Sequence, residues 1–176
     1  VAIGQEAGQN ATTGASNVYI GNVAVGLGVH TGSASVVLGA EAGYRLTSGS
    51  SNVLIGYQAG LYTTTGNFNI AVGRETLENN STGASNVAVG YQALRLSSTA
   101  SNNTAVGYQA GYSQTTNSDI VAVGYRAAFS NTATKTHAFG YDALFNNTTG
   151  GNNTAVGWKA GAANTTATQG TFLGES

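Results

Sequence analysis

Apolar residues recur along this chain in a short alternating pattern that ends in a glycine. In the stretch 86–94, which reads NVAVGYQAL, two valines stand on either side of an alanine. An alternation with a period of two predicts a β-strand, because successive strand residues point to opposite faces of a sheet. The same pattern returns along the whole chain, so the sequence predicts many short strands of one kind.

The glycine that ends each alternating segment recurs at a nearly constant spacing of 17 residues. One interval of 18 separates Gly21 from Gly39, and one of 16 separates Gly124 from Gly140. The column comprises Gly4, Gly21, Gly39, Gly56, Gly73, Gly90, Gly107, Gly124, Gly140, Gly157 and Gly174. A fixed short period is typical of a solenoid, in which each repeat stacks on the next. We therefore predict an all-β fold, a parallel β-solenoid or β-roll of about ten 17-residue turns. Residues 1–176 form a single repeat array, which we interpret as a fragment of a longer fibre.

The alternation also suggests which strand residues are buried. The two flanking columns carry mostly Val, Ile and Leu, as at Val87 and Val89, and we expect them to form the core. The intervening column is largely alanine, at Ala71, Ala88, Ala105, Ala122, Ala138 and Ala155. Because a solvent-facing column should be polar, we expect these alanines to pack against other copies of the chain.

The segments between the strands have the composition of turns. Gly and Asn tolerate a positive φ, and stretches such as Thr64-Thr65-Gly66 predict corners, where we expect the two irregular intervals to be absorbed. A triangular β-helix needs an aliphatic residue every six positions, but counting from Val106 leads to Tyr112 and Ser118, which favours a flattened two-sided roll. Because one unit buries too little apolar surface to be stable alone, the units must stack, and the thin core favours a homotrimer.

Three units carry a resemblance to known repeat families: NNTAVGYQAG (102–111), SNVAVGYQAL (85–94) and NNTAVGWKAG (152–161). They resemble the repeats of bacteriophage tail fibres, and their N-x-A-V/I-G core is also similar to the head repeats of trimeric autotransporter adhesins. The resemblance covers essentially all of the chain, and the 17-residue period is closer to the phage form. It implies a homotrimeric shaft or head, in a virion tail fibre or on a cell surface, that supports attachment to a host or surface through a cell-surface glycan or protein receptor.

Charge and composition bear on the classes of partner. The net charge is −1, and the six basic residues are spread along the chain, so we expect no nucleic-acid partner. Only 7% of the residues are charged while 41% are hydrophobic, which argues against disorder. No apolar run of 18 residues occurs, so we expect no membrane insertion.

The residue types that carry catalysis do not recur together. His30 and His137 lie many turns apart, and we interpret each as a tolerated substitution in its column. One column of mixed polar residues contains the carboxylates Glu6, Glu41, Glu75 and Asp142, which we interpret as a solvated ladder. Asp119 and Asp142 are too few for calcium-binding repeats, and Gly26-Leu27-Gly28 lacks the third glycine of a phosphate loop. We predict that the chain is not an enzyme and has no catalytic residues, no cofactor-binding residues, no metal site and no cofactor.

Two further columns leave alternatives open. One column consists of Thr and Ser, at Thr12, Thr47, Thr64, Ser81, Ser98, Thr115, Thr132, Thr148 and Thr165. A flat ice-binding face needs a second threonine two residues later on the same side of the strand. Because that later residue is usually glycine here, we favour a structural ladder at the corner over ice binding. A tyrosine column at Tyr91, Tyr108, Tyr125 and Tyr141 suits either a sugar-stacking strip or a ladder of stacked rings, and we favour the ladder. The trimeric fibre thus stands first, the adhesin head second and an ice-binding solenoid third.

Overall fold

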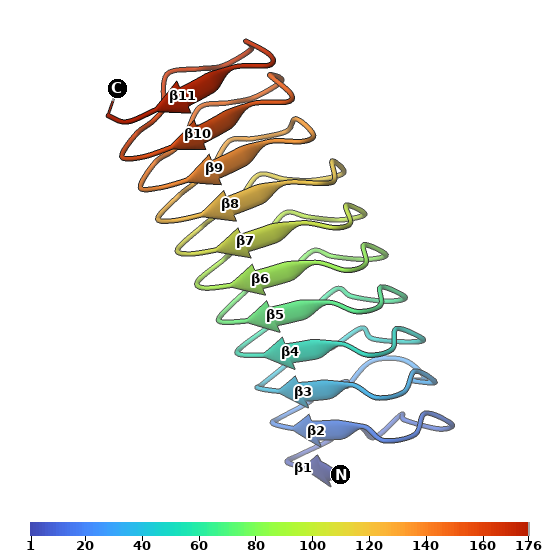
Figure 1. Cartoon of the computed structure of the whole chain (residues 1–176). Helices are drawn as coiled ribbons and strands as arrows, with labels where there is room; N and C mark the ends of the chain where they lie inside the picture. Colours follow the sequence, from blue (N-terminus) through green and yellow to red (C-terminus); the bar gives the residue numbers. More distant parts are fainter. Residues whose placement is uncertain (176) are drawn as a thin grey trace.

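The computed structural model describes residues 1–175, which form a flattened coil of stacked turns with one short strand per turn (Figure 1). The described residues contain no helix, and their eleven strands form one parallel sheet in sequence order. The strands are β1 (Ala2–Ile3), β2 (Val18–Ile20), β3 (Val36–Leu38), β4 (Val53–Ile55), β5 (Ile70–Val72), β6 (Val87–Val89), β7 (Thr104–Val106), β8 (Val121–Val123), β9 (His137–Phe139), β10 (Thr154–Val156) and β11 (Thr171–Leu173). The predicted all-β parallel solenoid is confirmed.

The register of the sheet is kept through both irregular intervals. Val18 of β2 pairs with Val36 of β3 across the longer unit, and Val121 of β8 pairs with His137 of β9 across the shorter one. The longer unit departs from its neighbours near Gly28 and Val29, where the valine is exposed and the backbone leaves the regular path. The prediction that corners absorb the length changes is confirmed, because the strand columns remain aligned.

The second side of the roll consists of turns and not of strands. After each strand the chain reverses and runs back along the other side of the coil, as Figure 1 shows. Consecutive turns are still joined there by backbone bonds: Gln109 N donates to the carbonyl of Tyr91 at 2.8 Å, and Gly111 N donates to that of Ala127 at 2.9 Å. A layer of turns therefore faces a layer of strands, and both are hydrogen-bonded along the axis.

The expected orientation of the strand residues is wrong. The middle residue of each strand from β2 to β10 is buried, and Ala71, Ala88 and Ala105 are fully so. The flanking Val, Ile and Leu residues point outward and are half-buried or exposed. The alanine column is thus the inner strand column, and the two aliphatic columns form the outer face of the strand layer.

Volume inside the roll explains this inversion. The two layers lie so close together that a large residue on one side needs a small one opposite. A Cβ added to Gly60 would lie 2.9 Å from Cδ2 of Leu54, an inner strand residue, and one on Gly161 would lie 2.8 Å from Cγ of Phe172, the middle residue of β11. Alanine therefore suits most of the inner column, while the bulkier side chains are excluded to the outer face.

The recurring glycine is required because consecutive turns touch there. Gly107 has a φ of 136°, and a Cβ at this position would lie 2.3 Å from the carbonyl oxygen of Gly124 in the next turn. Any side chain would collide with backbone, which explains a column of glycines at the corner that follows the strands.

An interior ladder of asparagines joins the opposite corner to the strands. Asn86 is fully buried; its Nδ2 donates to the carbonyl of Ala100 at 2.9 Å, and its Oδ1 accepts from the backbone N–H of Asn103 at 3.0 Å. The buried members of this ladder are Asn17, Asn52, Asn69, Asn86, Asn103 and Asn153. Each satisfies backbone groups that the corner would otherwise leave unpaired inside the protein.

Candidate interaction surfaces

The outer face of the strand layer is unusually apolar for a surface. Several of its large side chains are between 37 and 74% exposed; they are Ile3, Ile70, Val106, Phe139, Val156 and Leu173. Since the strands are in register, these residues form continuous columns along the axis. A contiguous apolar strip on a protein surface marks an interaction site.

A column of stacked aromatic rings lies beside this strip, at the corner that follows the strands. The rings of Tyr91, Tyr108 and Tyr125 are 5.1 Å apart and nearly parallel, with interplanar angles of 16° and 10°. Tyr141 and Trp158 continue the column at 4.9 and 4.0 Å. These five residues constitute the aromatic ladder, and the prediction of stacked rings is confirmed.

The stacking decides how the aromatic ladder can be used. Each internal ring has a neighbouring ring against both of its faces, so only ring edges and hydroxyl groups are exposed. A sugar ring packs against the face of an aromatic ring, which this geometry withholds. Strand spacing of about 4.8 Å imposes the arrangement, since it leaves no room for a ligand between rings.

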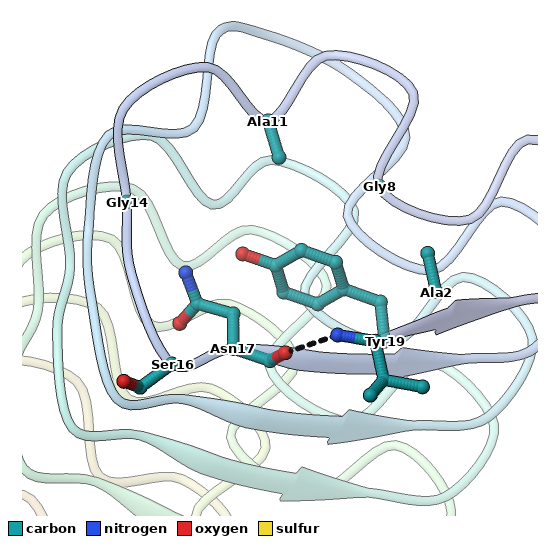
Figure 2. Close-up of a pocket in the computed structure, with 8 residues that line it drawn as sticks. Ala2, Gly8, Ala11, Gly14, Ser16, Asn17 and Tyr19 are labelled. Carbon is teal, nitrogen blue, oxygen red and sulfur yellow. Dashed lines mark hydrogen bonds between the residues drawn. The ribbon is translucent and has the colours of Figure 1, made fainter.

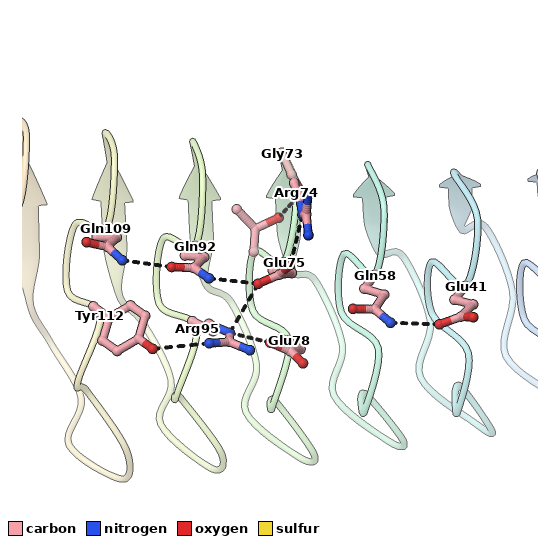
Figure 3. A network of polar contacts seen from close by, with 11 residues as sticks. Glu41, Gln58, Gly73, Arg74, Glu75, Glu78, Gln92, Arg95, Gln109 and Tyr112 are labelled. Atoms are coloured by element: carbon pink, nitrogen blue, oxygen red, sulfur yellow. Dashed lines mark hydrogen bonds and ion pairs between the residues drawn. The ribbon is translucent and has the colours of Figure 1, made fainter.

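The polar column lies on the turn layer, two residues after each recurring glycine, and its side chains bond to one another (Figure 3). Gln58 donates to Glu41 at 2.7 Å, and Gln92 donates to Glu75 at 2.7 Å. Gln109 in turn donates to Gln92 at 2.7 Å. The predicted ladder is confirmed, although at Glu75, Gln92 and Asp142 it is buried and not solvated.

Arginines neutralise most of the carboxylates of this layer. Glu75 contacts Arg74 at 2.8 Å and Arg95 at 3.5 Å, and Arg95 also pairs with Glu78. The amide of Gln92, followed by the arginines, lowers the pKa of Glu75 against the opposing effect of burial. The lowered pKa keeps the carboxylate of Glu75 ionised, and its oxygens are occupied by Arg74, Gln92 and Arg95, so Glu75 is not available as a proton donor.

The two histidines occupy different environments. His30 is fully buried, with its Nδ1 2.6 Å from the hydroxyl of Tyr19 and its Nε2 3.3 Å from the carbonyl of Gly49. Burial lowers the pKa of His30 and raises the pKa of Tyr19 to about 12. His137 lies on the outer face of β9 and is exposed. The side chains of His30 and Tyr19 are buried inside the roll, where a substrate would not reach them. Among the described residues no carboxylate bonds to either side chain.

The Thr/Ser column forms a corner ladder. The hydroxyl of Thr64 donates to the carbonyl of Ser81 at 2.9 Å, and that of Ser81 donates to the carbonyl of Ser98 at 2.9 Å. Thr132 and Thr148 repeat the arrangement. The hydroxyl protons are therefore used within the protein, which supports the structural interpretation of this column over the ice-binding one.

A hollow of about 270 Å³ opens at the start of the stack, between residues of the first turn (Figure 2). Gly8, Asn17 and Tyr19 line it, and the N-terminal amino group donates to the carbonyl of Asn17 at 2.8 Å. The hollow lies against the inner side of the first turn, and Tyr19, which most later turns replace by alanine at the equivalent strand position, forms part of its wall.

Within residues 1–175 no group of three or more His, Asp or Glu residues could hold a metal ion. The same part of the chain contains no helix long and apolar enough to cross a membrane. The chain matches no protein-family model, no curated protein and no solved structure at a significant level.

Proposed function

We propose that the chain is a structural and adhesive segment of a homotrimeric tail fibre or related surface filament, which supports attachment to a host or surface. The observation that carries this proposal is the apolar outer face of the strand layer. In the trimer this face packs against the other two copies, so each subunit covers the aliphatic columns of its neighbours. The filament belongs to a virion or to the cell surface, and its further partner is a cell-surface glycan or protein.

The size of the apolar strip supports an interface. Ten intervals of about 4.8 Å give a length of about 48 Å, and the two outer columns lie about 7 Å apart along the strand. The strip thus covers on the order of 300 Å² before the aromatic ladder is added, which is comparable to the largest apolar patch of an ordinary monomer, a patch that is often functional.

The distribution of residues along the strip favours a parallel assembly. In the first strand column the early turns carry Val18, Val36 and Val53, whereas Thr154 and Thr171 stand in the last turns. A rotation axis parallel to the solenoid places each turn beside the same turn of another copy, so apolar residues meet apolar ones. An antiparallel arrangement would set threonine against valine, which loses apolar contact.

The hydrogen-bond pattern suits a load-bearing shaft. Backbone bonds link each turn to the next on both layers, and the asparagine ladder links them in the interior. The turn layer, with its polar column, lies away from the strand face and remains available in the trimer for contact with a receptor.

Light scattering of the purified chain tests the proposal. We expect a particle of three times the chain mass of 17.6 kDa. The double variant Ile70→Asp/Val106→Asp should be monomeric with an unchanged circular dichroism spectrum, because both side chains point outward. A wild-type monomer, or a trimer that survives the double variant, would contradict the proposed interface.

A further inference from the structure

The turn layer of the first four turns contains a groove. The groove has a volume of about 420 Å³ and follows the axis over three intervals, or about 15 Å. Its lining residues are Glu6, Val23, Glu41, Gln58, Tyr44, Arg45, Leu61 and Tyr62. A volume of this size is in the range of small-molecule sites.

Two residues of the irregular second turn depart from their columns beside the groove. Val23 occupies the polar column between Glu6 and Glu41, where a valine provides no hydrogen bond, so the chain of side-chain bonds stops at Glu41. Gly26 stands in the column that later carries Tyr112, Phe129 and Phe145, whose stacked rings are 5.1 Å apart. The groove therefore lies where the polar column is interrupted by the apolar Val23 and where the neighbouring column has Gly26 in place of a ring.

The carboxylates of the groove lack the basic partners found further along the chain. Glu75, Glu78 and Asp142 each pair with an arginine. Among the described residues Glu6 and Glu41 form no ion pair: Glu41 accepts one bond from Gln58 through Oε2, and Glu6 accepts a 3.5 Å bond from Gln9. The groove thus retains negative charge and unused acceptor atoms.

The aromatic rings of the groove also differ from those of the ladders. Tyr44 and Tyr62 stack on no other ring in the described part of the chain, and Arg45 lies 4.9 Å from the ring centroid of Tyr62. Tyr62 is 37% exposed. Tyr44 and Tyr62 thus line the groove without a ring stacked on them, although the guanidinium of Arg45 lies over one face of Tyr62, whereas the internal rings of the aromatic ladder have a ring against both faces.

We propose that this groove binds a linear saccharide that carries protonated amino groups. The apolar faces of the sugar rings pack against Tyr44 and Tyr62, and the ammonium groups bond to Glu6 and Glu41. Gln58 supplies an amide oxygen for the sugar hydroxyls. An amine without sugar rings would satisfy the carboxylates alone, and a neutral sugar would satisfy only the rings and the amide, so the combination of groups selects an amino sugar. The site lies on the turn layer and does not depend on the trimer interface.

Titration calorimetry of the full chain with glucosamine tetramer tests this site. Glu41→Gln, which keeps the bond from Gln58, and Tyr62→Leu should each weaken binding about threefold to tenfold. Asn146→Ala is the matched control, because Asn146 stands in the column of Tyr62 but outside the groove, and its affinity should equal that of the wild type. N-acetylglucosamine tetramer and spermidine, used as comparison probes, should both bind more weakly.

Four results would overturn the proposal: no heat of binding with glucosamine tetramer, equal affinity for the acetylated tetramer, equal affinity for spermidine, or unchanged binding in both groove variants. Light scattering of the same samples reports the oligomeric state separately. A trimer without binding would refute the groove and leave the filament intact, whereas a monomer that binds would refute the filament alone.

Discussion

The inner and outer columns of the strand layer differ in side-chain size and in their surroundings. Ala105 and Ala155 are fully buried between the two layers, while the adjacent Val106 and Val156 are 37 and 45% exposed. In a single-layer sheet on a thick core, the larger aliphatic residues would be the buried ones. Here the narrow interior reverses the order, since a turn residue of the opposite layer already occupies the space beyond each alanine.

This difference separates two roles within one three-residue strand. The inner column and the asparagine ladder stabilise the single chain, and the outer columns form the surface through which we propose that chains associate. Substitutions on neighbouring residues should consequently have effects of different kind and size.

The largest difference is expected between Ala105 and its neighbour Val106. Ala105→Arg forces an unpaired charge into the interior and should cost more than about 4 kcal/mol of unfolding free energy, enough to prevent folding. Val106→Asp places its charge on the outer face, so the chain should fold and lose only its association. Circular dichroism and light scattering on both variants check this pair. A folded Ala105→Arg protein would contradict the structure, because it would show that the interior has space for a large side chain at this position.

The next largest effect concerns the asparagine ladder. Asn86→Ala leaves the carbonyl of Ala100 and the N–H of Asn103 buried without partners, which should cost about 2 to 4 kcal/mol. Asn146→Ala, at an exposed position, should stay within about 0.5 kcal/mol of the wild type. Urea denaturation at a fixed protein concentration measures both. Equal stability of the two variants would show that the asparagine ladder does not stabilise the chain.

A smaller effect is expected in the aromatic ladder. Tyr108→Ser removes two stacking contacts at 5.1 Å and should cost about 1 to 3 kcal/mol. In the described part of the chain no ring stacks on Tyr57, and the guanidinium of Arg74 lies over its ring, 5.3 Å from the centroid, so Tyr57→Ser should cost less. Melting temperatures of the two variants compare the contributions. If Tyr57→Ser were the more damaging change, ring stacking would not be what stabilises this corner.

The smallest effect is a pH dependence that arises from His30. Burial lowers the pKa of this histidine below its ordinary 6.5, so the unfolded chain binds a proton that the folded chain resists. Stability should therefore fall as the pH decreases through about 6.5 and should be unaffected by His30 above that value. Glu75, whose pKa is lowered from 4.5, acts only at more acidic pH.

His30→Gln provides the control for this dependence. Its amide oxygen can still accept a hydrogen bond from Tyr19 but does not titrate, so the loss of stability between about pH 7.5 and 5.5 should disappear. Urea unfolding at the two pH values measures it. An equal loss in both proteins would assign the titration to another group.

The period of the sequence was sufficient to predict the topology. Eleven glycines in one column place every strand in register, and the Gly- and Asn-rich segments mark the corners. The inside and outside of the strand could not be predicted in the same way, because a period of two is unchanged when the two faces are exchanged. The assumption that Val87 and Val89 were more buried than Ala88 failed because the width of the interior depends on residues of the opposite layer.

The candidate sites were only partly predictable. The aromatic ladder follows directly from the tyrosine column, since a constant spacing in a parallel solenoid stacks like residues. The groove lies beside Val23 and Gly26, which depart from their columns. It was not predicted because aligning the repeats emphasises the residues that recur and not the exceptions. The buried role of Asn86 was also missed, because its composition suggested only a turn.

Cysteine cross-linking tests most directly the claim that the outer strand face joins copies of the chain. The sequence contains no cysteine, so single substitutions report single positions. Val156→Cys lies on the outer face near one end of the stack, and Asn146→Cys lies on the turn layer. With a short bismaleimide, the parallel trimer predicts covalent pairs of chains from Val156→Cys and none from Asn146→Cys. Cross-linking through Asn146→Cys alone, or through neither position, would contradict the account.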